Sequence, residues 1–148
     1  MTTPPLLLLA EGRKPRLRRA PRVRPKEIAT HMGVAKVLRD HARPEWRWTH
    51  VPNGELRDVR TAAKLKQMGV RRGWPDFILV SPRGLLHCLE LKRLGEELSD
   101  DQEAFRAWCI SHGAPHVVAW TFDEALAALD TWGVLRIDIA AMKKGGAP

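Results

Sequence analysis

Two apolar segments of the sequence each carry an acidic residue where a charge is costly. Asp76 comes directly before the run FILV (77–80), and Glu90 lies within LLHCLEL (85–91). Lys92 follows two residues after Glu90. A buried carboxylate is destabilising unless a cation compensates its charge. Because carboxylate oxygens are the ligands that Mg²⁺ and Mn²⁺ prefer, these residues predict a divalent metal site, with Lys92 supplying part of the positive charge.

A β-hairpin would bring these three side chains together. The two apolar runs are typical of strands, and the turn SPRG separates them. If Val80 pairs with Leu86, Asp76 lies opposite Glu90, and the period of two puts Lys92 on the face of Glu90. Like charges directly opposite each other are destabilising. The hairpin therefore predicts a cation between Asp76 and Glu90.

A purely structural alternative exists for the same residues. Glu90 and Lys92 could form an ion pair on an exposed strand edge, and Asp76 could be a turn residue. Each motif alone is common by chance. Both strands are apolar on both faces, however, which is typical of buried strands. We therefore favour the metal site.

The neighbouring sequence predicts the elements that position the hairpin. Ile28, Met32, Ala35 and Leu38 recur at helical spacing and predict a helix from residue 26 that Pro44 ends. The other expected elements, in chain order, are a strand in 45–51, a helix over 58–68, the hairpin, a helix that begins with a capping box at Ser99 and Gln102, a strand over 116–121 and a helix over 123–129. This order predicts one mixed α/β domain.

Length and composition fit a single globular domain. The chain has 148 residues, of which 44% are hydrophobic. The apolar run Leu6–Ala10 is too short for a membrane span or a secretion signal. Cys88 and Cys109 form no disulfide framework, so we expect a reducing cytoplasm, which would be the host's if the protein is phage-encoded.

Charge is distributed unevenly along the chain. The net charge is +8, and residues 1–26 hold eight basic residues against one acidic residue. Residues 36–72 hold ten basic and four acidic residues, whereas residues 76–130 hold four basic and ten acidic. This polarity predicts a polyanionic partner and a cation site. Residues 1–25, rich in Pro and Arg, are expected to be a disordered basic arm; the alternative is a disordered end with no partner.

The ordered motifs resemble a known family. GWPDFILV, CLELKRL and LSDDQEAF, together with HVPNG and the lead-in KLKQMGVRRGWPD, resemble the VRR-NUC (virus-type replication-repair nuclease) domain of the PD-(D/E)xK nuclease superfamily. The resemblance covers about residues 27–130. It implies an α/β fold with a restriction-endonuclease-like core, a central mixed β-sheet flanked by helices, in a domain over 26–132. A partly disordered C-terminal extension over 133–148 would follow.

The resemblance also implies roles for individual residues. Asp76 and Glu90 match the ligands of Mg²⁺ or Mn²⁺, and the backbone carbonyl of Leu91 would be a third ligand. Lys92 matches the lysine that orients the attacking water and stabilises the developing charge. Gln102 matches a glutamine whose side chain points back at the site. Asp76, Glu90, Lys92 and Gln102 are therefore the expected catalytic residues.

Several of these assignments have simpler alternatives. Glu27 matches a metal ligand on the first helix more loosely, and acidic residues are favoured in a first helical turn in any case. Gln102 could serve only as the capping partner of Ser99, although the two roles are compatible. His31 is expected on the helix surface.

Basic residues near the motifs could bind nucleic acid or form a solvated face. The candidates for phosphate contacts are Arg57, Arg60, Arg71, Arg72 and Asn53. His50 and Asn53 lie in the PNG region, and His50 has no assigned role. The six tryptophans are expected in the core, with Trp74 the exception because it lies beside the site.

The resulting hypothesis is a metal-dependent endonuclease. Family resemblance suggests branched, junction or flap DNA as the substrate and a homodimer as the assembly, with the apolar segment WGVLRIDIAAM as a candidate interface. By analogy, the compact architecture is typical of phage or prophage proteins. The alternatives are a non-catalytic DNA-binding protein on a nuclease-like fold and a nuclease that acts on RNA.

Overall fold

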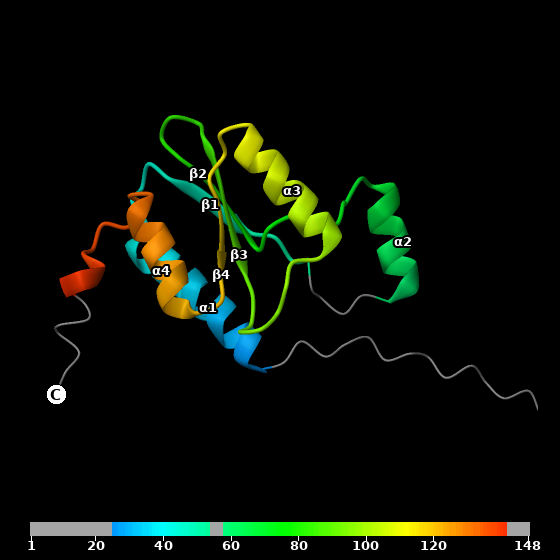
Figure 1. The fold of residues 1–148 in the computed structure, drawn as a ribbon, viewed down its shortest axis with the longest axis horizontal. Coiled ribbons are helices and arrows are strands. Elements are labelled where there is room, and N and C mark those ends of the chain that lie inside the picture. The colour runs from blue at the N-terminus through cyan, green and yellow to red at the C-terminus, as the bar shows by residue number, and fades with distance from the viewer. Residues whose placement is uncertain (1–24, 54–57, 142–148) are drawn as a thin grey trace, which may run out of the picture.

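The computed structural model describes residues 25–53 and 58–141 (Figure 1). Most of the expected basic arm, and Arg57, lie outside these residues. The elements in chain order are α1 (Pro25–His41), β1 (Arg47–His50), α2 (Val59–Gln67), β2 (Phe77–Val80), β3 (Leu86–Leu91), α3 (Asp100–Ser111), β4 (His116–Ala119) and α4 (Phe122–Thr131). The predicted mixed α/β fold, with a central sheet flanked by helices, is confirmed.

The sheet has four strands in the order β1-β2-β3-β4. Strands β1, β2 and β3 are antiparallel neighbours, whereas β4 runs parallel to β3. Val80 pairs with Leu86, so the predicted hairpin register is confirmed. The residue before β2 and the end of β3 therefore meet at one edge of the sheet.

Helices cover both faces of this sheet. Helices α1 and α4 lie on one face and α3 lies on the other (Figure 1). The main core forms between the sheet and the α1–α4 layer and includes Phe77, Leu79, Leu89 and Leu129, each fully buried. A smaller cluster under α3 contains Cys88 and Cys109.

Strand β3 is apolar almost throughout because both of its faces are covered. Leu89 and Leu91 point into the main core, whereas Cys88 packs against α3. Successive residues of a strand face opposite sides, so Glu90 shares the α3 side with Cys88. The strand is covered on both faces, and Glu90 is consequently buried in it.

Helix α1 packs through a face that only partly matches the predicted one. Leu38 is buried and Ala35 packs against the core, as predicted. Ile28 and Met32 are instead 45% and 65% exposed, and Val34 is fully buried. His31 lies on the same side as Val34 and Leu38, at the spacing i, i+3 and i+7. The polar histidine interrupts the buried stripe, and for this reason the apolar pattern alone misplaces Ile28 and Met32.

Helix α2 stands apart from the rest of the domain (Figure 1). Asp58 caps its N-terminus by accepting a hydrogen bond from the Thr61 amide, and Gly69 follows its C-terminus with a φ of 94°. These boundaries agree with the prediction. None of its residues is buried, and Val59 is 80% exposed.

The segment after α4 belongs to the folded body as far as residue 141. Val134, Leu135 and Ile139 are buried in the main core, and Leu135 forms a bridge with Ala42. Because these three side chains pack within their own chain, they are not available to the candidate dimer interface suggested for this segment.

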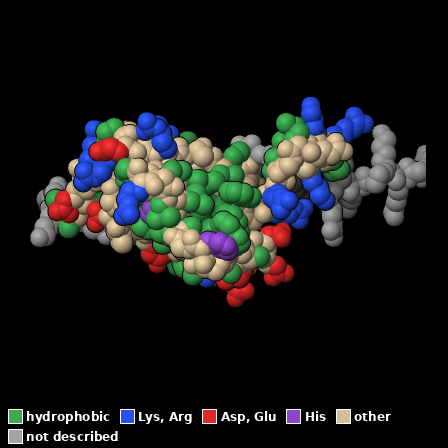
Figure 2. Space-filling view, turned by 90° about the horizontal axis from the view of Figure 1, so that it is seen from above, with side chains coloured by type: hydrophobic (Ala, Val, Ile, Leu, Met, Phe, Trp, Pro, Cys, Tyr) green, Lys and Arg blue, Asp and Glu red, His purple; other side chains and the backbone are tan. Residues whose placement is uncertain are grey.

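Two of the six tryptophans contradict the expectation of burial, since Trp108 and Trp120 are 51% and 40% exposed. Trp74, the expected exception, is 37% exposed. In Figure 2 an apolar surface lies at the centre of the face seen from above. No helix in the described part of the chain is long and apolar enough to cross a membrane.

Candidate active site

Asp76 is fixed from two sides at the edge of the sheet. Its backbone carbonyl accepts a hydrogen bond of 2.8 Å from the Val51 amide after β1. Its Oδ2 atom accepts a bond of 2.8 Å from the Leu91 amide at the end of β3. The carboxylate is thus held against both neighbouring strands. The contact described for Leu91 involves its N–H, and the metal-binding role of its carbonyl stays a prediction.

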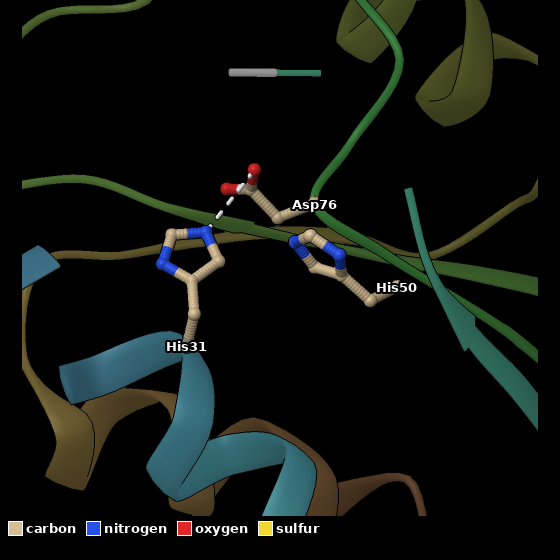
Figure 3. A group of neighbouring side chains, drawn as sticks. All are labelled: His31, His50 and Asp76. Atoms are coloured by element: carbon tan, nitrogen blue, oxygen red, sulfur yellow. Dashed lines mark ion pairs between the residues drawn. The ribbon is translucent and has the colours of Figure 1, made fainter. Parts of the chain in front are cut away.

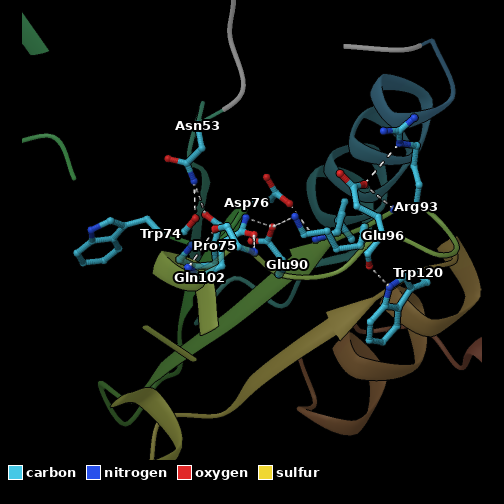
Figure 4. Close-up of polar contacts among 12 residues, drawn as sticks. Asn53, Trp74, Pro75, Asp76, Glu90, Arg93, Glu96, Gln102 and Trp120 are labelled. Carbon is cyan, nitrogen blue, oxygen red and sulfur yellow. Dashed lines mark hydrogen bonds and ion pairs between the residues drawn. The ribbon is translucent and has the colours of Figure 1, made fainter. Parts of the chain in front are cut away.

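Glu90 is an acid buried beside this carboxylate (Figure 4). The residue is 3% exposed. Burial, and after it the negative charge of Asp76, raise the pKa of Glu90 to about 8, while Lys92 acts in the opposite direction. Lys92 Nζ lies 3.7 Å from Glu90 Oε1. The two acids and the lysine therefore lie together, as the hairpin register implies.

Gln102 combines the two roles that the sequence leaves open. Its Oε1 atom accepts a hydrogen bond of 2.9 Å from the Ser99 amide, which completes the capping box of α3. Its Nε2 atom donates a hydrogen bond of 2.6 Å to Glu90 Oε1. The start of α3 thereby fixes the orientation of Glu90.

The loop before Asp76 is held by close backbone contacts. Gly73 has a φ of 85°, and a Cβ atom there would lie 2.4 Å from the Asp101 carbonyl oxygen. Only glycine suits this position. The Asn53 amide donates hydrogen bonds to the carbonyls of Trp74 and Pro75 (Figure 4). The sequence predicts that Asn53 contacts nucleic acid, whereas in the structure its amide group supports the loop.

Two histidines complete the surroundings of Asp76 (Figure 3). His31 Nε2 lies 3.3 Å from Asp76 Oδ1, and its side chain is only 18% exposed, so the prediction that His31 lies on the surface is wrong. His50, at the end of β1, belongs to the same group. The sequence offered one signal for His31, its position one turn after Glu27, but the contact with Asp76 depends on the packing of α1 against the sheet.

The other predicted residues are more dispersed. Glu27 lies in the first turn of α1, and its side chain is outside the described part of the structure. Arg60 is exposed on α2. Arg71 and Arg72 are exposed on the loop before Trp74.

An open groove of about 1340 Å³ lies between α2, this loop and the start of α3. Its lining includes Lys66, Arg71, Arg72, Trp74 and Gln102. Lysine and arginine side chains gather over α2 at the right of Figure 2. Because Gln102 contacts Glu90, the basic groove leads to the buried acid.

The donor set at the edge of the sheet fits a divalent cation. Asp76 and Glu90 present carboxylate oxygens, and burial together with the negative charge of Asp76 raises the pKa of Glu90 to about 8. Lys92 alone, at 3.7 Å, does not compensate both acids. A hard ion such as Mg²⁺ or Mn²⁺ would supply that charge.

A mixed sheet with two acids and a lysine at the mouth of its central hairpin is typical of a nuclease-type fold. The VRR-NUC domain model matches residues 35–121, and the chain belongs to this family. A solved structure described as a VRR_NUC domain protein is 19% identical, with a TM-score of 0.57, over 76% of this chain and 92% of its own. Another, described as a VRR_NUC domain, is 16% identical, with a TM-score of 0.52, over 72% of this chain and 97% of its own. No curated protein matches the chain.

Proposed function

We propose that this protein is a metal-dependent endonuclease that hydrolyses phosphodiester bonds in DNA. The observation that carries the proposal is the buried Glu90 beside Asp76, with Lys92 Nζ at 3.7 Å and the Gln102 amide at 2.6 Å. Asp76, Glu90 and the carbonyl of Leu91 would hold Mg²⁺ or Mn²⁺. Glu27 is a weaker candidate for a further ligand.

The bound ion would supply Lewis-acid activation of the phosphate and of the attacking water. The chain itself does the positioning. The Leu91 amide holds Asp76, and Gln102 holds Glu90, so that neither carboxylate has to reorganise when substrate arrives. Lys92 would orient the attacking water and offset the negative charge that grows on the phosphoryl group.

The groove beside α2 suits a nucleic-acid backbone. Lys66, Arg71 and Arg72 line it, and such contacts bind phosphates without reading sequence. The family resemblance favours branched, junction or flap DNA over uniform duplex. A homodimer would place two sites to cut two strands.

The decisive experiment compares wild type with Asp76→Ala and Lys92→Ala. Each variant is incubated with branched DNA, duplex DNA and structured RNA in Mg²⁺ or Mn²⁺, and cleavage is followed by gel. We expect both variants to lose cleavage and to retain DNA affinity, measured by fluorescence anisotropy, because neither residue lines the basic groove.

Three outcomes would overturn parts of this proposal. Wild-type cleavage rates in either variant would show that the site is wrong. Salt-dependent binding without cleavage by the wild type would indicate a non-catalytic DNA-binding protein. Cleavage of the RNA alone would keep the chemistry and change the substrate.

A further inference from the structure

His31, His50 and Asp76 come from three separate elements and meet at one point (Figure 3). Each offers one possible ligand atom, and these atoms all lie within 4.8 Å of one another. His31 comes from α1, His50 ends β1, and Asp76 precedes β2. The group therefore joins the α1 layer to two strands of the sheet.

The buried ring of Phe77 supports both imidazoles. The His31 ring stacks on Phe77 with centroids 6.2 Å apart, and the His50 ring meets Phe77 edge-on at 5.2 Å. The two imidazoles are themselves 5.4 Å apart and nearly perpendicular. Phe77 is fully buried, so it gives the two rings a rigid base.

Asp76 presents its two oxygens to different layers. Oδ2 accepts the Leu91 amide on the β3 side, and Oδ1 lies 3.3 Å from His31 Nε2 on the α1 side. Zn–N and Zn–O bonds of about 2.0 to 2.1 Å place neighbouring donors of a tetrahedral ion about 3.3 Å apart. The His31–Asp76 pair already has this spacing, and a small rotation of the exposed His50 would bring in the third donor.

The ligand atoms of this group differ in type from those of the Asp76–Glu90 pair. Two imidazole nitrogens and one carboxylate oxygen suit borderline ions such as Zn²⁺ and Co²⁺, whereas Mg²⁺ prefers oxygen ligands alone. Three protein ligands leave a tetrahedral ion with one open position. Glu90 is not needed for this set.

We propose that His31, His50 and Asp76 form a second metal site, selective for a first-row transition ion of the Zn²⁺ or Co²⁺ type. The site shares Asp76 with the proposed nuclease centre, and its existence does not rest on cleavage of nucleic acid. A bound ion would also tie α1 to the edge of the sheet.

Direct binding tests this site without any activity assay. Tag-free full-length protein, stripped with a chelator, is titrated with Co²⁺ and followed by the visible d–d absorption of the ion. We expect one equivalent to bind with a tetrahedral-type spectrum, and Zn²⁺ but not excess Mg²⁺ to displace it.

Matched variants then locate the ligands. His31→Gln and His50→Gln should each weaken Zn²⁺ binding by on the order of 100-fold. Removing a residue that only hydrogen-bonds a metal ligand costs about 10- to 100-fold in affinity, and removing the ligand itself should cost at least as much. Glu90→Gln should leave it unchanged. His112→Gln, at the far end of α3 from Gln102, is the histidine control and should also bind normally. Circular dichroism establishes that each variant is folded.

Three results would contradict the second site. Wild-type affinity in both histidine variants would exclude the imidazoles. Loss of binding in Glu90→Gln, with the histidine variants unaffected, would place the ion between the carboxylates alone. A thiolate-to-Co²⁺ band in the near ultraviolet would instead indicate Cys88 and Cys109, whose sulfurs lie 3.9 Å apart. Lys92→Ala separates the two proposals, since it should abolish cleavage and leave Co²⁺ binding intact.

Discussion

Glu90 is the residue at which stability and chemistry conflict. It is buried next to Asp76, and its pKa is raised to about 8. An ordinary glutamate would be ionised at neutral pH, whereas the metal-free protein holds this one protonated. A buried leucine would pack better at this position of β3. In the proposed nuclease, Glu90 would be a ligand that ionises when a cation binds.

The raised pKa predicts a specific pH dependence for the metal-free protein. Between about pH 4.5 and pH 8 the unfolded chain loses the Glu90 proton while the folded chain keeps it. The free energy of unfolding should consequently fall as pH rises through this window. Glu90→Gln removes the effect, so it should match wild type at pH 5 and exceed it at pH 8, on the order of a few kcal/mol.

Urea unfolding in the presence of a chelator at the two pH values measures this difference. Glu97→Gln, at an exposed position, is the control and should follow wild type at both values. Parallel pH profiles for wild type and Glu90→Gln would contradict the interpretation of Glu90 as an acid held neutral by burial.

Lys92 should not tolerate the exchange for arginine. Its side chain is 12% exposed and lies 3.7 Å from Glu90 Oε1, where a planar guanidinium cannot place its donors as a compact ammonium does. We expect Lys92→Arg to lower the cleavage rate by on the order of 100-fold or more. Lys64→Arg, the same exchange on the exposed helix α2, is the control and should cleave at the wild-type rate. Equal cleavage rates for the two variants would show that Lys92 takes no part in the reaction.

At the scale of elements, the site depends on where two loops touch. Gly73 packs against the backbone of Asp101, next to the residue that holds Glu90. Gly69 has a similar φ of 94°, but a Cβ atom there would meet no other atom within 4 Å. Substitutions at these two glycines therefore distinguish the energetic cost of a positive φ from the cost of a steric clash.

Gly73→Ala and Gly69→Ala give a matched pair. Both place alanine at a positive φ, which costs roughly 1 kcal/mol. Gly73→Ala also forces a clash at 2.4 Å with the Asp101 carbonyl, so it should lose further stability and shift the loop that carries Asp76. Urea unfolding and cleavage rates measure both effects. Normal cleavage by Gly73→Ala would show that this contact does not position the site.

The hairpin could be predicted from sequence, and the packing of α1 could not. The runs around Val80 and Leu86 are short, apolar and separated by a clear turn, so local patterning determines their register. The packed side of α1 includes His31, whose Nε2 atom lies 3.3 Å from Asp76 Oδ1. Periodicity favours Met32 instead, because no local rule places a histidine on a buried stripe.

The candidate site likewise contains residues placed by local sequence and residues placed only by tertiary packing. The capping box predicts the position of Gln102 at the start of α3, whereas its role at the site could be predicted only from the family resemblance. The convergence of His31 and His50 arises only when α1, β1 and β2 assemble. Burial of Val134 and Leu135 is likewise a tertiary effect, and an apolar segment at the end of a domain does not reveal whether it faces its own core.

At the scale of the whole molecule, the basic and acidic regions of the sequence lie in different parts of the structure. The basic region 36–72 includes α2 and the Arg71–Arg72 loop, and the acidic region 76–130 includes the buried acids and α3. The two regions meet at the groove. A nucleic-acid backbone that enters on the basic side would thus reach the acids only where a cation can offset their charge.

Helix α2 should gain most of its stability from bound nucleic acid. It has nine residues and no buried side chain, and helices of this length are marginal without packing. In the free protein its amides should exchange with solvent much faster than those of β2 and β3. Branched DNA bound to the inactive Lys92→Ala variant should slow exchange in α2 and in the Arg71–Arg72 loop, as measured by hydrogen–deuterium exchange.

A charge-reversed variant provides the control for this last prediction. Arg71→Glu combined with Arg72→Glu should abolish the added protection and weaken DNA binding, with a shallower dependence of affinity on salt, because two phosphate contacts are lost. If α2 exchanges as slowly as β3 in the free protein, it packs more tightly than its exposure indicates. If DNA instead protects α4, the substrate lies on the opposite face of the sheet, and the groove beside α2 is not where it binds.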